Sequence, residues 1–183
     1  MADVPEVRFD DSVARPIFPR PVLKMAALVP IPHAEDGSEI TTFIKPEWGG
    51  VQVFYGSYYG IISNGVVIYG SAKDQWEAMH SQVRHEHWVK TAVPLAYQAS
   101  GPCRIVTLIP ADDGGVREAN YTLEPSDWIV RQPGGEVQHV KAAKFGAIYF
   151  SHEEAVALGL TGMTSDEFAD WAVGQVRRVV NVG

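Results

Sequence analysis

The stretch Tyr58-Tyr-Gly-Ile-Ile-Ser-Asn-Gly-Val-Val-Ile-Tyr69 places two β-rich runs on either side of an Asn-Gly pair. Asn-Gly tolerates the positive φ angles that a tight hairpin turn requires, so this stretch predicts an antiparallel β-hairpin. Further short runs of β-branched and aromatic residues, separated by Gly, Pro, Asn and Asp, predict strands on both sides of it. These runs cover 22–29, 39–44, 51–55, 89–98, 103–109, 119–123, 128–131 and 136–140, with turns at 112–115 and 133–135.

Helical patterns follow the hairpin and return at the end of the chain. Ser71 as a cap, followed by apolar residues at helical spacing, predicts a helix that runs to about Trp88. Two Ser/Thr-x-x-Glu patterns, which begin at Ser151 and Thr164, predict two C-terminal helices with capping boxes. The second of these helices carries one apolar stripe, formed by Phe168, Trp171, Ala172, Val176 and Val179.

The succession of strand, hairpin and aromatic segment occurs twice along the chain. Residues 22–28 are comparable with residues 88–94, with chance similarity between two β-rich stretches as the alternative. We therefore expect an α+β protein with two similar curled antiparallel β-sheet units, each with a short helix, and a C-terminal helical hairpin. The expected segments are a proline-rich arm without secondary structure of its own (1–21), the two units (22–87 and 88–150) and the C-terminal helices (151–183).

Composition excludes several classes of function. The 183 residues carry 15 Lys and Arg against 22 Asp and Glu, a formal charge of −7, which argues against capture of nucleic acid by clustered basic side chains. No apolar run approaches the roughly 20 residues that cross a bilayer, and no signal segment is visible, so we expect a cytoplasmic protein without a membrane partner. The single cysteine, Cys103, lies in a predicted strand, and we expect a core residue.

One region resembles a known family. Residues 123–136 read Leu-Glu-Pro-Ser-Asp-Trp-Ile-Val-Arg-Gln-Pro-Gly-Gly-Glu, and a Phe-x-x-x-Tyr pattern follows at 145–149. Over roughly residues 88–150 this pattern resembles the PGDYG-type domains common in bacteriophage genomes, although Ser126 and Ile129 stand where that family has glycine. The resemblance implies a phage accessory protein that acts in the host cytoplasm, and it implies no catalytic residue.

The same motif has a structural interpretation. Pro125 presets a turn, Asp127 can accept hydrogen bonds from backbone amides across that turn, and Trp128 then points into a core. We expect Phe145 and Tyr149 to close this core.

Three histidines, His80, His85 and His87, are the first candidates for chemistry. On a helix they point to different sides, and neither a zinc-binding spacing nor a phosphate-binding glycine loop is present, so we expect no metal and no cofactor. A hydrolase that uses His85 or His87 with Glu86 as acid and base is the enzymatic alternative.

The sequence has more aromatic residues than the core faces of the two predicted sheets can bury. Some rings should therefore line a cleft, where aromatic faces and nearby cations suit a small anionic ligand of nucleotide type. We predict a noncatalytic binding protein for such a ligand or for a host protein, with counter-defence as one concrete role. A virion assembly protein, whose rings form the interface of a homo-oligomer, is a further alternative. The predicted ligand-binding residues are Tyr55, Tyr58, Tyr59, Trp76, Trp128, Arg131, His139 and Lys141.

Overall fold

A computed structural model describes residues 4–47, 51–109 and 116–180. Within these ranges the chain is an α+β protein with several antiparallel β-sheets, four α-helices and a long C-terminal helix, as the sequence predicts. Contacts divide it into two compact units, one of residues 1–20 and 92–168 and the other of residues 21–91 and 169–183. We call them the 92–168 unit and the 21–91 unit. The predicted turn at 112–115 lies outside the described residues.

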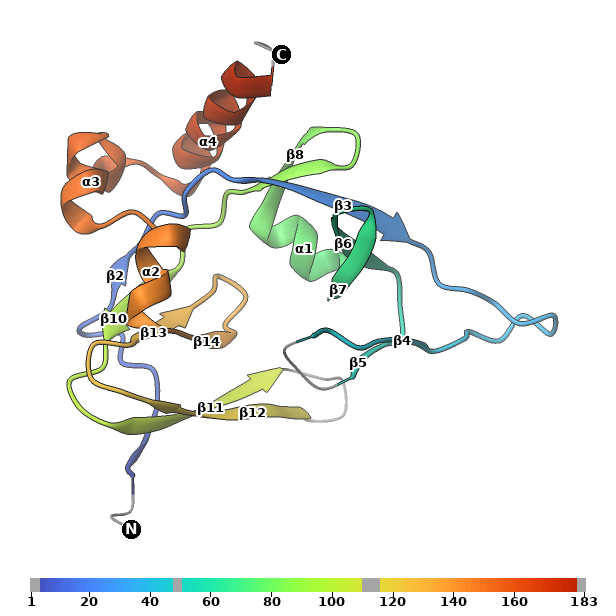
Figure 1. Cartoon of the computed structure of the whole chain (residues 1–183), viewed down its shortest axis with the longest axis horizontal. Coiled ribbons are helices and arrows are strands. Elements are labelled where there is room, and N and C mark those ends of the chain that lie inside the picture. Colours follow the sequence, from blue (N-terminus) through green and yellow to red (C-terminus); the bar gives the residue numbers. More distant parts are fainter. Residues whose placement is uncertain (1–3, 48–50, 110–115, 181–183) are drawn as a thin grey trace. The chain divides into compact units, whose positions relative to one another are not determined.

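The strands of the 21–91 unit form a five-stranded sheet and a two-stranded ribbon (Figure 1). They are β3 (Leu23–Val29), β4 (Thr42–Ile44), β5 (Gln52–Phe54), β6 (Tyr58–Ser63), β7 (Val66–Ala72), β8 (His80–Arg84) and β9 (His87–Lys90). The sheet has the order β7-β6-β3-β9-β8, and β4 pairs with β5 in the ribbon. The predicted hairpin is confirmed, because β6 and β7 pair across Asn64 and Gly65, whose φ angles are 51° and 77°.

The ribbon is fastened to β7 at one glycine. The Gln52 side chain accepts a hydrogen bond from the Gly70 amide at 2.9 Å and donates one to the Gly70 carbonyl at 3.2 Å. An added Cβ at Gly70 would lie 2.5 Å from the Phe54 Cζ atom, so the close approach of the Phe54 ring requires glycine there.

The helix predicted for residues 71–88 is shorter than expected. Helix α1 covers Lys73–Met79, its N-cap is Ala72 rather than Ser71, and the N-cap makes no side-chain hydrogen bond. Residues His80–Lys90 instead form the antiparallel hairpin β8–β9, and the predicted boundary after residue 87 falls inside β9. Pairing of β9 with β3 and burial of Trp88 and Val89 outweigh the local helical spacing.

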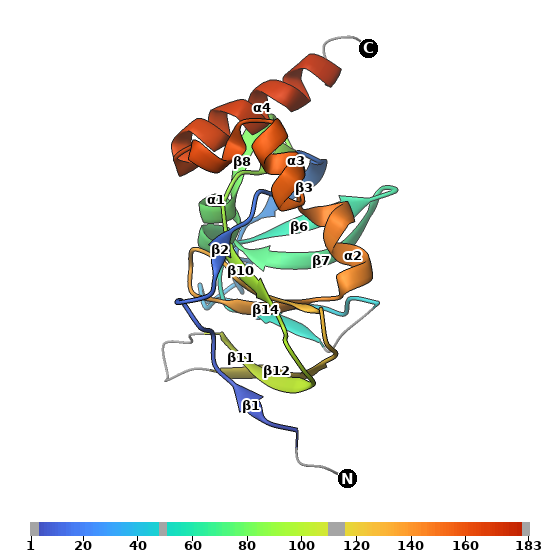
Figure 2. The same cartoon turned by 90° about the vertical axis from the view of Figure 1, so that its left-hand side faces the viewer.

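The 92–168 unit contains two sheets and two short α-helices. The strands are β1 (Glu6–Val7), β2 (Arg15–Pro16), β10 (Leu95–Gln98), β11 (Cys103–Ile109), β12 (Val116–Leu123), β13 (Trp128–Arg131) and β14 (Val137–Val140). One sheet has the order β14-β13-β10-β2 and the other β1-β11-β12, and Figure 2 shows β1 beside β11 and β12. The helices are α2 (Ala142–Ile148) and α3 (His152–Ala157), and the predicted turn at 133–135 is confirmed between β13 and β14.

The N-terminal arm does not lack secondary structure, which corrects the prediction. Strand β1 pairs in parallel with β11, and β2 pairs with β10. Ile17 and Phe18 are buried, and the Phe9 ring packs edge-on against Tyr97 with ring centroids 5.3 Å apart.

The C-terminal helices begin where the sequence predicts. Ser151 and Glu154 form a capping box before α3, and Thr164 and Glu167 exchange the same hydrogen bonds before α4 (Ser165–Val180). A single 3-10 turn (Leu160–Gly162) lies between the two helices. The apolar stripe is buried at Phe168, Ala172 and Val176, but Val179 is 77% exposed, so the stripe ends one turn earlier than predicted.

Candidate functional site

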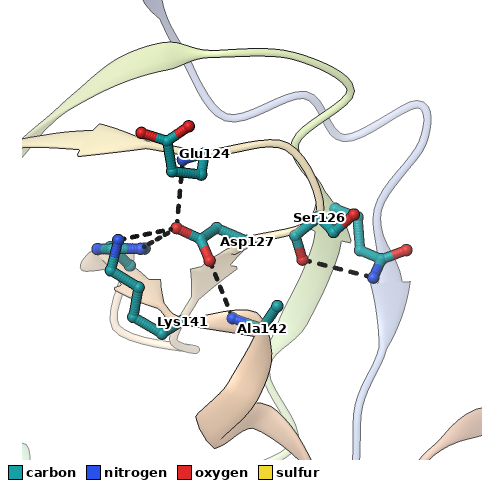
Figure 3. A network of polar contacts seen from close by, with 7 residues as sticks. Glu124, Ser126, Asp127, Lys141 and Ala142 are labelled. Carbon is teal, nitrogen blue, oxygen red and sulfur yellow. Dashed lines mark hydrogen bonds and ion pairs between the residues drawn. The ribbon is translucent and has the colours of Figure 1, made fainter.

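A buried carboxylate, Asp127, is the centre of a polar cluster in the 92–168 unit (Figure 3). Its Oδ1 accepts a hydrogen bond from the first amide of α2, that of Ala142, at 2.9 Å. Its Oδ2 accepts from His139 Nε2 at 2.9 Å, from Lys141 Nζ at 3.2 Å and from the Glu124 amide at 3.2 Å. The predicted role of Asp127, as an acceptor for backbone amides across its turn, is confirmed.

The electrostatics of this cluster favour the ionised form of the Asp127 carboxyl group. Burial of Asp127 raises its pKa, but the hydrogen bonds from Ala142, His139, Glu124 and Lys141 lower it by more, so the net pKa lies far below its usual value. Asp127 is 4% exposed and its acceptor positions are occupied from several directions. The cluster therefore anchors the end of β14 and the start of α2 to the turn before β13.

The three basic residues of the predicted ligand-binding set have partners within the protein. His139 and Lys141 contact Asp127, as described above. Arg131 forms an ion pair with Asp11 of the arm, and its guanidinium carbon lies 4.4 Å above the Phe9 ring. The arm thus contacts β13 through charge and through a ring, and the Arg131 charge is partly neutralised.

Trp128 lines a cavity in the same unit. Its ring stacks on the Phe145 ring with centroids 3.8 Å apart and an interplanar angle of 12°. The cavity has a volume of about 500 Å³, within the range typical of small-molecule sites. Its apolar wall includes Ile17, Phe18, Ala96, Trp128, Phe145 and Phe150.

Polar groups border the cavity at several points. Arg15 of β2 is exposed and forms no ion pair with any described residue, and His152 contributes a second nitrogenous side chain. Gln98, Ser151 and Thr161 add hydrogen-bonding groups, and Glu153 is the one carboxylate of the lining. An aromatic wall with an arginine beside it can hold a planar ring that carries an anionic group.

The predicted aromatic residues of the 21–91 unit do not line a cleft together. Tyr58, Tyr59 and Trp76 are 6%, 6% and 1% exposed, so the expectation that these rings face outward is wrong. Tyr59 and Trp76 belong to a core cluster with Ala26, Ile61 and Trp88, while Tyr58 stacks on Phe54 with centroids 4.3 Å apart. Tyr55 is 76% exposed and is the one exposed ring among these four aromatic residues.

The histidines are separated in the structure. His80 is buried and stacks on Trp76, while His85 and Glu86 are exposed in the turn of the β8–β9 hairpin, where His85 has a φ angle of 39°. Within the described ranges, no group of three or more His, Cys, Asp or Glu side chains is placed to hold a metal ion. The His/Glu hydrolase stays a prediction.

Cys103 is 6% exposed and packs with Ile105, Leu123 and Ile129. Burial raises the pKa of its thiol, which disfavours the reactive thiolate. The expectation of a core residue is confirmed.

Sequence reasoning missed several residues of the cavity. Arg15 and Phe150 come from segments far apart in the chain, and only the pairing of β2 with β10 and of Pro19 with Tyr149 brings them to one site. Phe145 was expected in the core, and it is buried there while one part of it borders the cavity. No local pattern marks Arg15, because an Arg-Pro pair in an arm is common in chains without such a site.

Comparisons with family models, with curated proteins and with solved structures find no match to this chain. The resemblance to PGDYG-type domains therefore stays a prediction that depends on the motif alone. None of the helices in the described part of the chain is both long enough and apolar enough to cross a bilayer.

Proposed function

We propose that the protein is a noncatalytic binding protein whose 92–168 unit holds a small planar anion of nucleotide type. The observation that carries this proposal is the cavity of about 500 Å³ bordered by the stacked Trp128–Phe145 pair and by Arg15. A base would lie against the aromatic wall, and a phosphate or carboxylate would meet the guanidinium. The resemblance to phage domains adds the further proposal that such binding sequesters a host signal in the cytoplasm.

Of the predicted set, Trp128 alone is part of this proposal. Arg131 is engaged with Asp11, and His139 and Lys141 are engaged with Asp127. Displacing His139 and Lys141 would leave the buried Asp127 carboxylate without two of its partners. We therefore assign the anion to Arg15, with His152 beside it.

A titration with linear and cyclic nucleotides tests the proposal. We expect at least one of them to raise the melting temperature and to bind measurably in calorimetry. Arg15→Gln should weaken that binding by about tenfold or more, as loss of a charge-assisted hydrogen bond does. Arg177→Gln, on the exposed last turn of α4, is the matched control and should leave binding unchanged. If no nucleotide at millimolar concentration changes the melting temperature, the proposal is wrong.

A protein-binding role has its own supporting observation in the 21–91 unit. Phe43 and Val53 are paired across the β4–β5 ribbon, and they are 64% and 41% exposed. Tyr55, two residues after Val53, is 76% exposed. Exposed apolar groups gathered on one ribbon face are typical of a surface that another protein covers, whether a host protein or a second copy. Light scattering of the wild-type chain and of Phe43→Ser distinguishes a homo-oligomer from a monomer.

We also propose that the two halves of the chain are repeats, at a different offset from the one predicted. Adding 69 to residue numbers 57–80 gives 126–149, which matches Ser57 with Ser126 and Lys73–Met79 with α2 without a gap. Buried Ala26 and Ala96 lie opposite the matched residues Ile61 and Val130, respectively, although the two alanines are 70 residues apart rather than 69. Their equivalent places in the two sheets support the alignment. In both halves, the strand that comes directly before the first repeated strand in the sequence pairs in the other unit. Strand β9 precedes β10 in the chain but pairs with β3, and β2 precedes β3 but pairs with β10.

A further inference from the structure

Two lysines and a histidine share one face of the sheet in the 21–91 unit. Lys24 of β3 lies opposite Trp88 of β9, and Lys90 of β9 lies opposite His80 of β8. Directly opposed residues of antiparallel strands project from the same face, as do residues two apart on one strand. Lys24, Trp88, Lys90 and His80 are therefore on the same face, and Lys24 and Lys90 are diagonal neighbours.

Helix α1 places an aromatic wall beside these cations. The Trp76 ring stacks on His80 with centroids 3.7 Å apart, and the Lys24 Nζ atom lies 5.8 Å from its centroid. Trp88 meets Trp76 edge to face at 6.2 Å. Because both tryptophans are almost fully buried and both lysines are half-buried, the amines emerge beside a packed wall of rings.

The charge at this place is positive. Burial, and after it the Lys90 ammonium, lower the pKa of Lys24 to about 8. Within the described ranges no carboxylate forms an ion pair with Lys24, and Glu77 of α1 is engaged with Lys73 and with the Tyr59 hydroxyl. His80 stays neutral at physiological pH, because burial and the Lys24 charge lower its pKa to about 3.

Hydrogen-bond donors in the same cluster lack acceptors. The indole Nε1 atoms of Trp76 and Trp88 are buried with no hydrogen-bond partner among the described residues. The neutral His80 ring donates from Nδ1 to the Trp76 carbonyl at 3.2 Å, so its unpartnered Nε2 atom is an acceptor. An indole N–H can only donate, and buried donors in proteins almost always find an acceptor. This observation is independent of the lysines, and it points to a bound group with several acceptor oxygens.

We propose that Lys24 and Lys90 form a binding site for a phosphate group on this face of the 21–91 unit. A phosphate carries up to two negative charges and has enough oxygens for two ammonium groups and further donors, whereas a carboxylate has one charge and two oxygens. The site belongs to the other unit from the Trp128 cavity, so it does not depend on the function proposed above.

Protection of Lys24 from acetylation tests the site in the full-length chain. Near pH 8 the Lys24 amine is partly neutral, and N-hydroxysuccinimidyl acetate should modify it at a rate that mass spectrometry of peptides can follow. Inorganic phosphate at about ten times its dissociation constant should slow this modification by about tenfold, relative to chloride at equal ionic strength. Methyl phosphate tests whether a phosphate ester enters as free phosphate does.

Variants of Lys90 show whether both amines are required. Lys90→Met should abolish the protection of Lys24 by phosphate, Lys90→Arg should retain it, and Lys144→Met in the other unit is the matched control. If Lys90→Met fails to fold, protection of Lys24 by phosphate in the wild-type chain still tests the site. Equal protection by chloride or by acetate, or no protection by either phosphate, would overturn the proposal. Protection by inorganic phosphate or by methyl phosphate alone identifies the form of the group that binds.

Discussion

The starts of α1 and α2 satisfy the same backbone requirement with different groups. The first amide of α1, that of Lys73, donates to the main-chain carbonyl of Ser57 at 3.1 Å, whereas the first amide of α2 donates to the Asp127 side chain. Both helices have seven residues, and neither N-cap side chain makes a capping hydrogen bond to its helix. Each helix ends at an extended residue whose amide donates to the carbonyl four residues earlier. The backbone geometry is shared, and the chemistry that supports it is not.

The difference continues at the residues that the offset of 69 matches. Asp127 corresponds to Tyr58, which stacks on Phe54, and His139 corresponds to Gly70, which admits the Phe54 ring. A charged hub in one unit thus stands where the other has aromatic packing. We infer that the position of α2 depends on the charge of Asp127 and on all of its hydrogen bonds being made. The position of α1 depends instead on close packing of side chains.

Among the variants that test this contrast, removal of the Asp127 carboxylate should produce the largest loss of stability. Asp127→Ala leaves two amides, His139 and Lys141 without their acceptor in a buried site, and we expect a loss of about 3 kcal/mol in the free energy of unfolding. Urea denaturation measures the loss. Hydrogen exchange read by peptide should locate it in β13, β14 and α2.

Tyr58→Phe is the control at the matched position. The Tyr58 ring keeps its stacking on Phe54 in this variant, so we expect a change below about 0.5 kcal/mol. Equal costs at the two positions would contradict the contrast between a charged hub and a packed ring.

Residues that act within a short stretch of chain could be predicted from the sequence. The Asn64-Gly65 turn, the capping boxes at Ser151 and Thr164 and the turn role of Asp127 each involve partners a few residues apart, or a local φ angle. Such features can be recognised in a single sequence because both partners of each interaction lie within the same few residues.

Features that depend on distant strands could not be predicted. Residues 80–90 have helical spacing, yet they form β8 and β9 because β3 offers a pairing edge some 60 residues earlier in the chain. The lining of the cavity by Arg15, and the burial of Tyr58 and Tyr59, likewise follow from pairings that no local pattern encodes.

Acid should destabilise the 21–91 unit before it affects the Asp127 cluster. The pKa of His80 falls from about 6.5 to about 3 on folding, so its contribution is complete above pH 6.5 and is lost progressively as the pH falls toward 3. Between pH 7 and pH 5 this linkage costs about 2 kcal/mol. Asp127 has a lowered pKa, so its contribution is lost only below its usual value near 4.

Thermal unfolding as a function of pH measures the first of these effects. His80→Phe keeps a ring beside Trp76 without a titrating group, and it should flatten the melting temperature between pH 7 and pH 5. Tyr149 occupies the matched position in the other unit, so that position carries no imidazole. A slope that persists in His80→Phe would assign the acid sensitivity to another residue.

The smallest predicted effect has opposite signs in the two units. Ser126, directly before Asp127, has a φ of 73°, in the left-handed region where a side chain costs about 1 kcal/mol and glycine does not. The Ser126→Gly variant should therefore be more stable by about 0.5–1 kcal/mol. Ser57, its match in the other unit, does not have a positive φ, and its carbonyl already accepts the first amide of α1. Ser57→Gly therefore gains nothing in the folded state and loses chain entropy, so urea denaturation should show a small loss of stability where Ser126→Gly shows a gain. A gain at both positions would mean that the two turns share a strain that their φ angles do not show.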